Sequence, residues 1–181
     1  MPIVFGEEAY SIPEILAVFR KHGDKVRGTY TVRYRFGGGD RNPYAGASME
    51  RPAMFKDEDP HAIYPWESIL VAAANCAGSD YPMIAAHWGI PLEAVDIDLK
   101  AVFDPRGEFS GVDPAWKGIP EAPASYQSFR WSATLTSSAP REQLERLQKR
   151  VLSHNMVLNA LRAVPLTSEL KVQVPSPMPG R

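Results

Sequence analysis

The most apolar stretch of this chain constrains its fold more than any other feature. It runs from Pro65 to Gly78 as PWESILVAAANCAG, and Pro65 suits the first turn of a helix that is apolar on nearly every side. The helical pattern ends by Gly89, and Pro82 inside it predicts a kink or break that leaves the Gly78 carbonyl without its usual donor. Such a helix must be wrapped on all sides, by its own chain or by another subunit.

Shorter patterns around this helix predict an α+β domain. Ser11 and Glu14 form a capping box that opens a helix over residues 12–22. Pro140 opens another helix, and residues 156–162 add one or two helical turns. Alternating apolar residues predict strands over residues 30–36, 95–103, 126–136 and 170–174, and a weaker strand over 45–56. A turn is expected at residues 37–40 and a loop at 104–124.

Length, charge and composition favour one soluble cytoplasmic domain. The chain has 181 residues and a formal net charge of −1 without long basic or acidic runs, which gives no electrostatic case for nucleic acid or an anionic membrane. No segment approaches a membrane span, and the N-terminus lacks the pattern of a signal peptide. We expect one domain over residues 1–181, with an N-terminal helical extension over about 1–26 and a mobile tail at 175–181.

The one cysteine of the chain, Cys76, lies late in the apolar stretch. It has no partner for an intrachain disulfide and fits a reducing compartment. A buried thiol of this kind is a small inert core residue, a protected nucleophile, a redox sensor, or one half of an intermolecular disulfide. The four histidines show no metal-ligand spacing, so we expect no metal and no cofactor.

Three motifs, in order, carry a resemblance to a known family. They are the helix with Pro65 and an alanine-rich run ending in Asn75-Cys76, the segment HWGIPLE (87–93) followed by FDPRG (103–107), and SHNMVLNAL (153–161). Over roughly residues 60–170 the chain resembles the OsmC/Ohr family of osmotically induced and organic-hydroperoxide-resistance proteins. The resemblance implies antiparallel sheets around the central helix and an intertwined homodimer with one site per subunit near the interface.

The resemblance also implies a site that this chain has altered. Peroxidase-type relatives attack a hydroperoxide with one cysteine and resolve the product with a second, which opens a later helix as Cys-Pro. Cys76 matches the first position, whereas Asn155-Met156 replaces the Cys-Pro pair. Asparagine is a good N-cap, so the helix start is kept while the second thiol is lost.

The glutamate and the arginine that the resemblance implies beside the cysteine also differ in this chain. Where peroxidase-type relatives have a glutamate after the helix-opening proline, this chain has Trp66, and Glu67 follows about 100° further around the helix. Glu67 therefore either bonds to the helix N-terminus, which we favour, or acts in the site. The arginine of the family has two candidates here, Arg41 and Arg51, either of which would stabilise a thiolate at Cys76.

These residues favour two functions of different classes. The first is slow one-cysteine reduction of an organic hydroperoxide at Cys76, helped by Glu67 with Arg41 or Arg51, and regenerated by an external thiol. The second is a non-enzymatic dimer that binds a small hydrophobic ligand in its interface cleft. In the second case Cys76 is a core residue.

Overall fold

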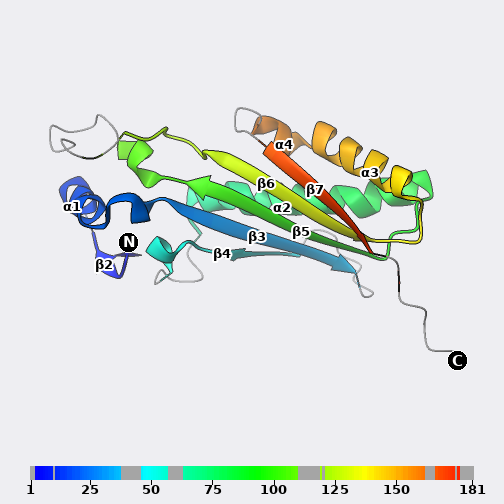
Figure 1. The fold of residues 1–181 in the computed structure, drawn as a ribbon, viewed down its shortest axis with the longest axis horizontal. Coiled ribbons are helices and arrows are strands. Elements are labelled where there is room, and N and C mark those ends of the chain that lie inside the picture. The colour runs from blue at the N-terminus through cyan, green and yellow to red at the C-terminus, as the bar shows by residue number, and fades with distance from the viewer. Residues whose placement is uncertain are drawn as a thin grey trace, which may run out of the picture.

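A five-stranded sheet with helices along one face forms the body of the chain in this computed structural model (Figure 1). The structure describes residues 3–9, 11–37, 46–56, 63–109, 119, 121–161, 166–173 and 175. The strands are β3 (Gly28–Gly37), β4 (Ala47–Glu50), β5 (Ala94–Phe103), β6 (Ser128–Thr136) and β7 (Leu166–Gln173), in the order β4-β3-β5-β6-β7. All neighbours are antiparallel except β6 and β7, which are parallel.

The helices are α1 (Ile12–His22), α2 (Pro65–Trp88), α3 (Arg141–His154) and α4 (Met156–Ala160). Short 3-10 helices cover Gly23–Val26, Ala53–Phe55 and Pro105–Phe109, and the strands β1 (Ile3–Val4) and β2 (Glu7–Glu8) form a small antiparallel pair ahead of α1. Figure 1 shows α2 and α3 on the same side of the sheet. The chain is therefore an α+β protein with a long helix laid along the sheet.

The two faces of the sheet differ as the alternating sequence requires. On β3, Tyr30, Val32 and Tyr34 are fully buried against the helices. The opposite face carries charged cross-strand pairs, such as Arg35 with Asp96 at 3.2 Å. The apolar face supplies the main stabilisation, because each large side chain that it buries contributes about 1.5–3 kcal/mol.

Helix α2 approaches the sheet closely through one small residue. A Cβ atom on Gly78 would lie 2.6 Å from the ring of Tyr34 on β3, a distance that real side chains do not allow. Glycine at this position lets the helix sit directly on the strand. Further along α2, Tyr81 is fully buried and accepts a 3.4 Å hydrogen bond from Nε1 of Trp131 on β6.

Most predicted elements are confirmed, and several details differ. The helices at 12–22, from Pro65 and after Pro140 are present. Of the kink or break predicted at Pro82, the break is absent, because α2 runs from Pro65 to Trp88 without interruption. In place of the strand predicted at 45–56, Ala47–Glu50 form a short strand and Ala53–Phe55 a 3-10 helix, because Pro52 has no N–H to continue the ladder. Strand β7 begins four residues earlier than predicted. Residues 38–41, His61, Trp116, Val174 and 176–181 lie outside the described residues.

Candidate thiol site

Cys76 lies in the middle of α2, partly exposed, beside the start of α4. The side-chain Nδ2 of Asn155 donates hydrogen bonds to Sγ of Cys76 at 3.1 Å and to Oδ2 of Asp80 at 2.8 Å. Asp80 follows Cys76 by four residues on α2, so both side chains lie on one face of the helix. Asn155, the residue that the family resemblance matches to a second cysteine, is thus in direct contact with the thiol.

The amide of Asn155 is held in one orientation. Asn155 is the N-cap of α4, and its Oδ1 accepts the backbone N–H of Leu158 at 2.9 Å. With Oδ1 used in this way, Nδ2 points at Cys76 and Asp80. Asn155 is only 1% exposed, so water does not compete for these bonds. The site therefore offers the sulfur a fixed hydrogen-bond donor and no second thiol.

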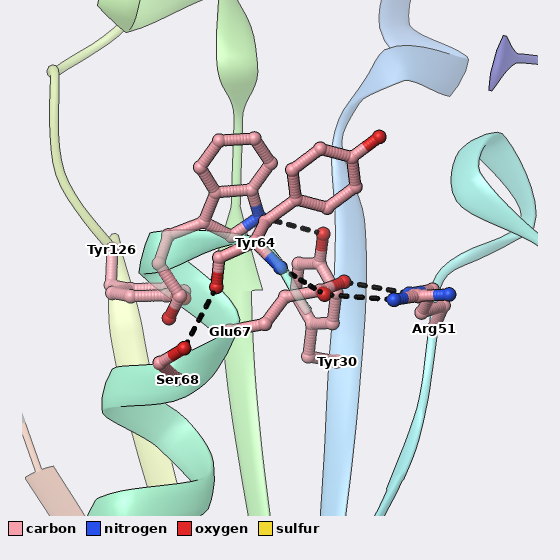
Figure 2. Close-up of polar contacts among 7 residues, drawn as sticks. Tyr30, Arg51, Tyr64, Glu67, Ser68 and Tyr126 are labelled. Carbon is pink, nitrogen blue, oxygen red and sulfur yellow. Dashed lines mark hydrogen bonds and ion pairs between the residues drawn. The ribbon is translucent and has the colours of Figure 1, made fainter. Parts of the chain in front are cut away.

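The second cluster joins Arg51 and Glu67 at the start of α2 (Figure 2). Nε and Nη2 of Arg51 donate to the two carboxylate oxygens of Glu67 at 2.8 and 3.0 Å, in a bidentate pair. The backbone N–H of Tyr64 donates to the same carboxylate at 3.0 Å, so Glu67 also bonds to the helix N-terminus, as the sequence predicted. The Arg51 and Glu67 side chains are 10% and 0% exposed, which makes the pair a buried one. Arg41 lies outside the described residues.

Aromatic rings pack around the Arg51–Glu67 pair. The indole of Trp66 stacks on Tyr64 at 4.5 Å and on Phe103 at 5.8 Å between ring centroids. Its Nε1 donates to the hydroxyl of Tyr30 at 3.1 Å, and the hydroxyl of Tyr126 donates to the Trp66 carbonyl at 2.6 Å. Burial raises the pKa of both Tyr30 and Tyr126, so both phenols stay neutral. Trp66, in the glutamate position of the peroxidase-type relatives, is a packing residue.

The two clusters do not meet within one chain. Glu67 and Cys76 are nine residues apart on one helix, which separates them by about 13–14 Å along the axis and half a turn around it. Among the described residues, no basic side chain bonds to Cys76 or pairs with Asp80. His154 is exposed and bonds to its neighbour Ser153 at the junction of α3 and α4.

Asp80 is the site residue that sequence reasoning missed. Its position one helical turn after Cys76 was the available signal, since such residues share a helix face. Within the described ranges, no three His, Cys, Asp or Glu side chains are grouped so as to hold a metal ion. None of the described helices, α2 included, combines the length and apolarity needed to cross a membrane.

A cysteine on a sheet-packed central helix, in contact with the start of a later helix, defines an α+β scaffold built around one thiol. The model of the family described as OsmC-like protein matches residues 57–169, well over half of the 181-residue chain. The chain belongs to the OsmC-like family.

Solved structures agree with this assignment at the level of fold. An OsmC-like hydroperoxide resistance protein from Jannaschia sp. CCS1 is 16% identical, covers 76% of this chain and 87% of its own, and has a TM-score of 0.51. An organic hydroperoxide resistance protein OsmC from Legionella pneumophila is 16% identical over 80% and 96% of the two chains, with a TM-score of 0.42. A hypothetical protein from Aquifex aeolicus VF5 is 18% identical over 64% and 78%, with a TM-score of 0.49. Of these three, the Jannaschia structure supports a shared fold. No curated protein matches the chain.

Proposed function

We propose that this protein is a thiol-dependent reductase of organic hydroperoxides that works slowly through Cys76 alone. The observation that carries the proposal is the 3.1 Å contact between Asn155 and Cys76, because it keeps the contact of a two-cysteine site while an amide replaces the second thiol. The likeness to hydroperoxide resistance proteins supports the substrate class. The lone cysteine fits a reducing compartment, and on that ground we place the protein in the cytoplasm.

The proposed cycle needs one hydroperoxide and two external thiols. The Cys76 thiolate attacks the terminal oxygen of the hydroperoxide, the O–O bond breaks, and the alcohol leaves after taking up a proton. The sulfur is left as a sulfenic acid. One external thiol then displaces water to form a mixed disulfide, and a second thiol releases Cys76 and leaves as the external disulfide. The Nδ2 hydrogen of Asn155 stabilises negative charge on the sulfur, but this side chain cannot resolve the sulfenic acid.

A second copy of the chain completes this site in our proposal. Ile69 and Met83 on α2 are 43% and 45% exposed, and Ala72 and Ala86 beside them are also exposed. Together with Cys76 these residues are spaced by three, four or seven positions along α2, so they lie on one face of the helix. This spacing is typical of a helix that packs against another helix. Because Arg51 and Cys76 are far apart within one chain, we assign the role of thiolate stabiliser to Arg51 of the partner subunit, held by Glu67 of the partner subunit.

The test is consumption of cumene hydroperoxide in the presence of dithiothreitol. We expect slow turnover by the wild-type protein and none by Cys76→Ser above the background rate of the reductant. Met156→Ser is the matched control, since Met156 is 81% exposed next to the site and should leave turnover unchanged. Equal consumption by wild-type protein and Cys76→Ser would contradict the proposal.

A groove beside Arg51 favours the second candidate function, ligand binding without catalysis. It has a volume of about 510 Å³, and its lining combines the apolar side chains of Met49, Ile63 and Val71 with the charged side chains of Glu50, Arg51 and Lys56. In this alternative a small hydrophobic ligand lies in the groove where the two subunits meet. A Cys76→Ala variant that keeps full affinity for such a ligand, in a protein that never consumes peroxide, would support it.

A further inference from the structure

A separate aromatic cavity lies between α1 and the 3-10 helix Pro105–Phe109. It has a volume of about 230 Å³. Two of its lining residues, Ile15 and Phe19, belong to α1, which precedes the residues matched by the family model. The residues that matter for its chemistry are Ile15, Phe19, Trp66, Phe103, Glu108 and Phe109. Cys76 and Asn155 do not line it.

The walls of this cavity are held in place by their own contacts. Trp66 is fixed by its hydrogen bond to Tyr30 and by its stack on Phe103. Phe19 of α1 meets Phe109 edge to face, with ring centroids 6.0 Å apart. A preformed cavity with apolar walls binds an apolar body without the cost of ordering its own side chains. The cavity is therefore suited to one aromatic ring or a compact branched alkyl group.

Among the described residues that line the cavity, Glu108 is the charged one, and it is exposed to solvent. No described basic side chain forms an ion pair with it. Arg106, two residues away, is held by the carboxylate of Asp104 at 2.6 Å and by Asp24 at 3.2 Å. A carboxylate at the rim of an aromatic cavity selects a positive charge and disfavours a negative one.

We propose that this cavity binds a small organic ammonium ion, with its apolar body among the rings and its ammonium group against Glu108. Cys76, Asn155, Arg51 and Glu67 do not line the cavity, although Tyr64 and Trp66 from the cluster around the Arg51–Glu67 pair do. Binding of an ammonium ion in this cavity can therefore be tested separately from peroxide reduction at Cys76.

The test is ligand-observed saturation-transfer NMR on the full chain, with 2-phenylethylammonium and phenylacetate as probes of opposite charge. We expect saturable binding of the ammonium probe, at least about fivefold tighter than that of phenylacetate. Glu108→Gln should remove this preference and leave both probes weak. Glu142→Gln, an exposed glutamate on α3, is the matched control and should bind as the wild-type protein does.

A second variant tests the location of the site. Ile15→Trp should fill the cavity and abolish binding of the ammonium probe, with an unchanged far-UV circular dichroism spectrum as the check on folding. The proposal is overturned by the absence of saturable binding of 2-phenylethylammonium, or by an unchanged preference in Glu108→Gln. Because Glu108 is exposed, its substitution leaves the core intact and the test decisive.

Discussion

The amide nitrogen of Asn155 lies 3.1 Å from the sulfur of Cys76 and is held there by a further hydrogen bond to Asp80. The helix that starts at Asn155 therefore brings its first side chain to the thiol on α2. An amide in this place donates a hydrogen bond to the sulfur and cannot be oxidised to a disulfide. This contact explains how the scaffold can be kept while the chemistry of the second position changes.

Asn155→Cys should create a disulfide with Cys76 under oxidising conditions. The two side chains already touch, so a small rotation brings the sulfurs within bonding distance. We expect a mass loss of about two hydrogens after one equivalent of cumene hydroperoxide, measured on the intact protein. The reduced variant should be about 1 kcal/mol less stable, because it loses the side-chain cap on Leu158.

Met156→Cys is the control for this disulfide. Its side chain is 81% exposed and points away from the core, so we expect no intramolecular disulfide with Cys76. If Asn155→Cys stays fully reduced while Cys76 remains reactive toward alkylating agents, the contact between α2 and α4 is not as described.

The Arg51–Glu67 pair should matter strongly for stability. Glu67→Ala leaves a buried guanidinium without its carboxylate, and we expect the free energy of unfolding to fall by about 3–5 kcal/mol. Arg33→Ala, which breaks exposed ion pairs with Glu50 and Asp98, should cost no more than about 1 kcal/mol. Urea denaturation of both variants measures the difference, and similar losses would mean that the Arg51–Glu67 pair is solvated in solution.

The dimer proposal predicts a different effect for two exposed isoleucines. Light scattering of the wild-type protein should give twice the 20.0 kDa mass of one chain. Ile69→Glu places a charge on the exposed face of α2 and should shift the protein toward monomer. Ile12→Glu changes an isoleucine of similar exposure on α1 and should leave the dimer intact. A wild-type monomer at low micromolar concentration contradicts the proposed interface.

Three buried tyrosines predict a loss of stability at alkaline pH. Burial raises the pKa of Tyr30, Tyr81 and Tyr126 above the unfolded value of about 10. Their contribution to stability is complete below that value and is lost progressively as the pH rises above it. Absorbance at 295 nm should therefore show these three tyrosines ionising together with the loss of far-UV circular dichroism. Ionisation of all seven tyrosines before unfolding would contradict their burial.

The sequence predicted the elements whose pattern is local. The apolar run from Pro65 and the alternation in residues 30–36 gave α2 and β3 with nearly correct bounds, because hydrophobic spacing follows directly from which face is buried. Likewise Asn155 was recognised as an N-cap from its residue type, and its side chain does cap α4.

Features that depend on contacts distant in sequence were not predictable in the same way. The pairing of Arg51 with Glu67 depends on the position of β4 relative to the start of α2, and no local sequence pattern indicates the parallel pairing of β6 with β7. The break predicted at Pro82 is absent, because a helix packed on one side against the sheet and its neighbouring helices tolerates one missing hydrogen bond. Asp80 was missed since it matters only once Asn155 is brought against it.

The measurement that tests the central claim most directly is mass spectrometry of the protein after one equivalent of cumene hydroperoxide, with dimedone present to trap sulfenic acid. The account predicts rapid, quantitative labelling of Cys76, and no labelling in Cys76→Ser. A Cys76 that stays unmodified after long exposure would contradict peroxide reduction at this thiol and leave ligand binding as the function to pursue.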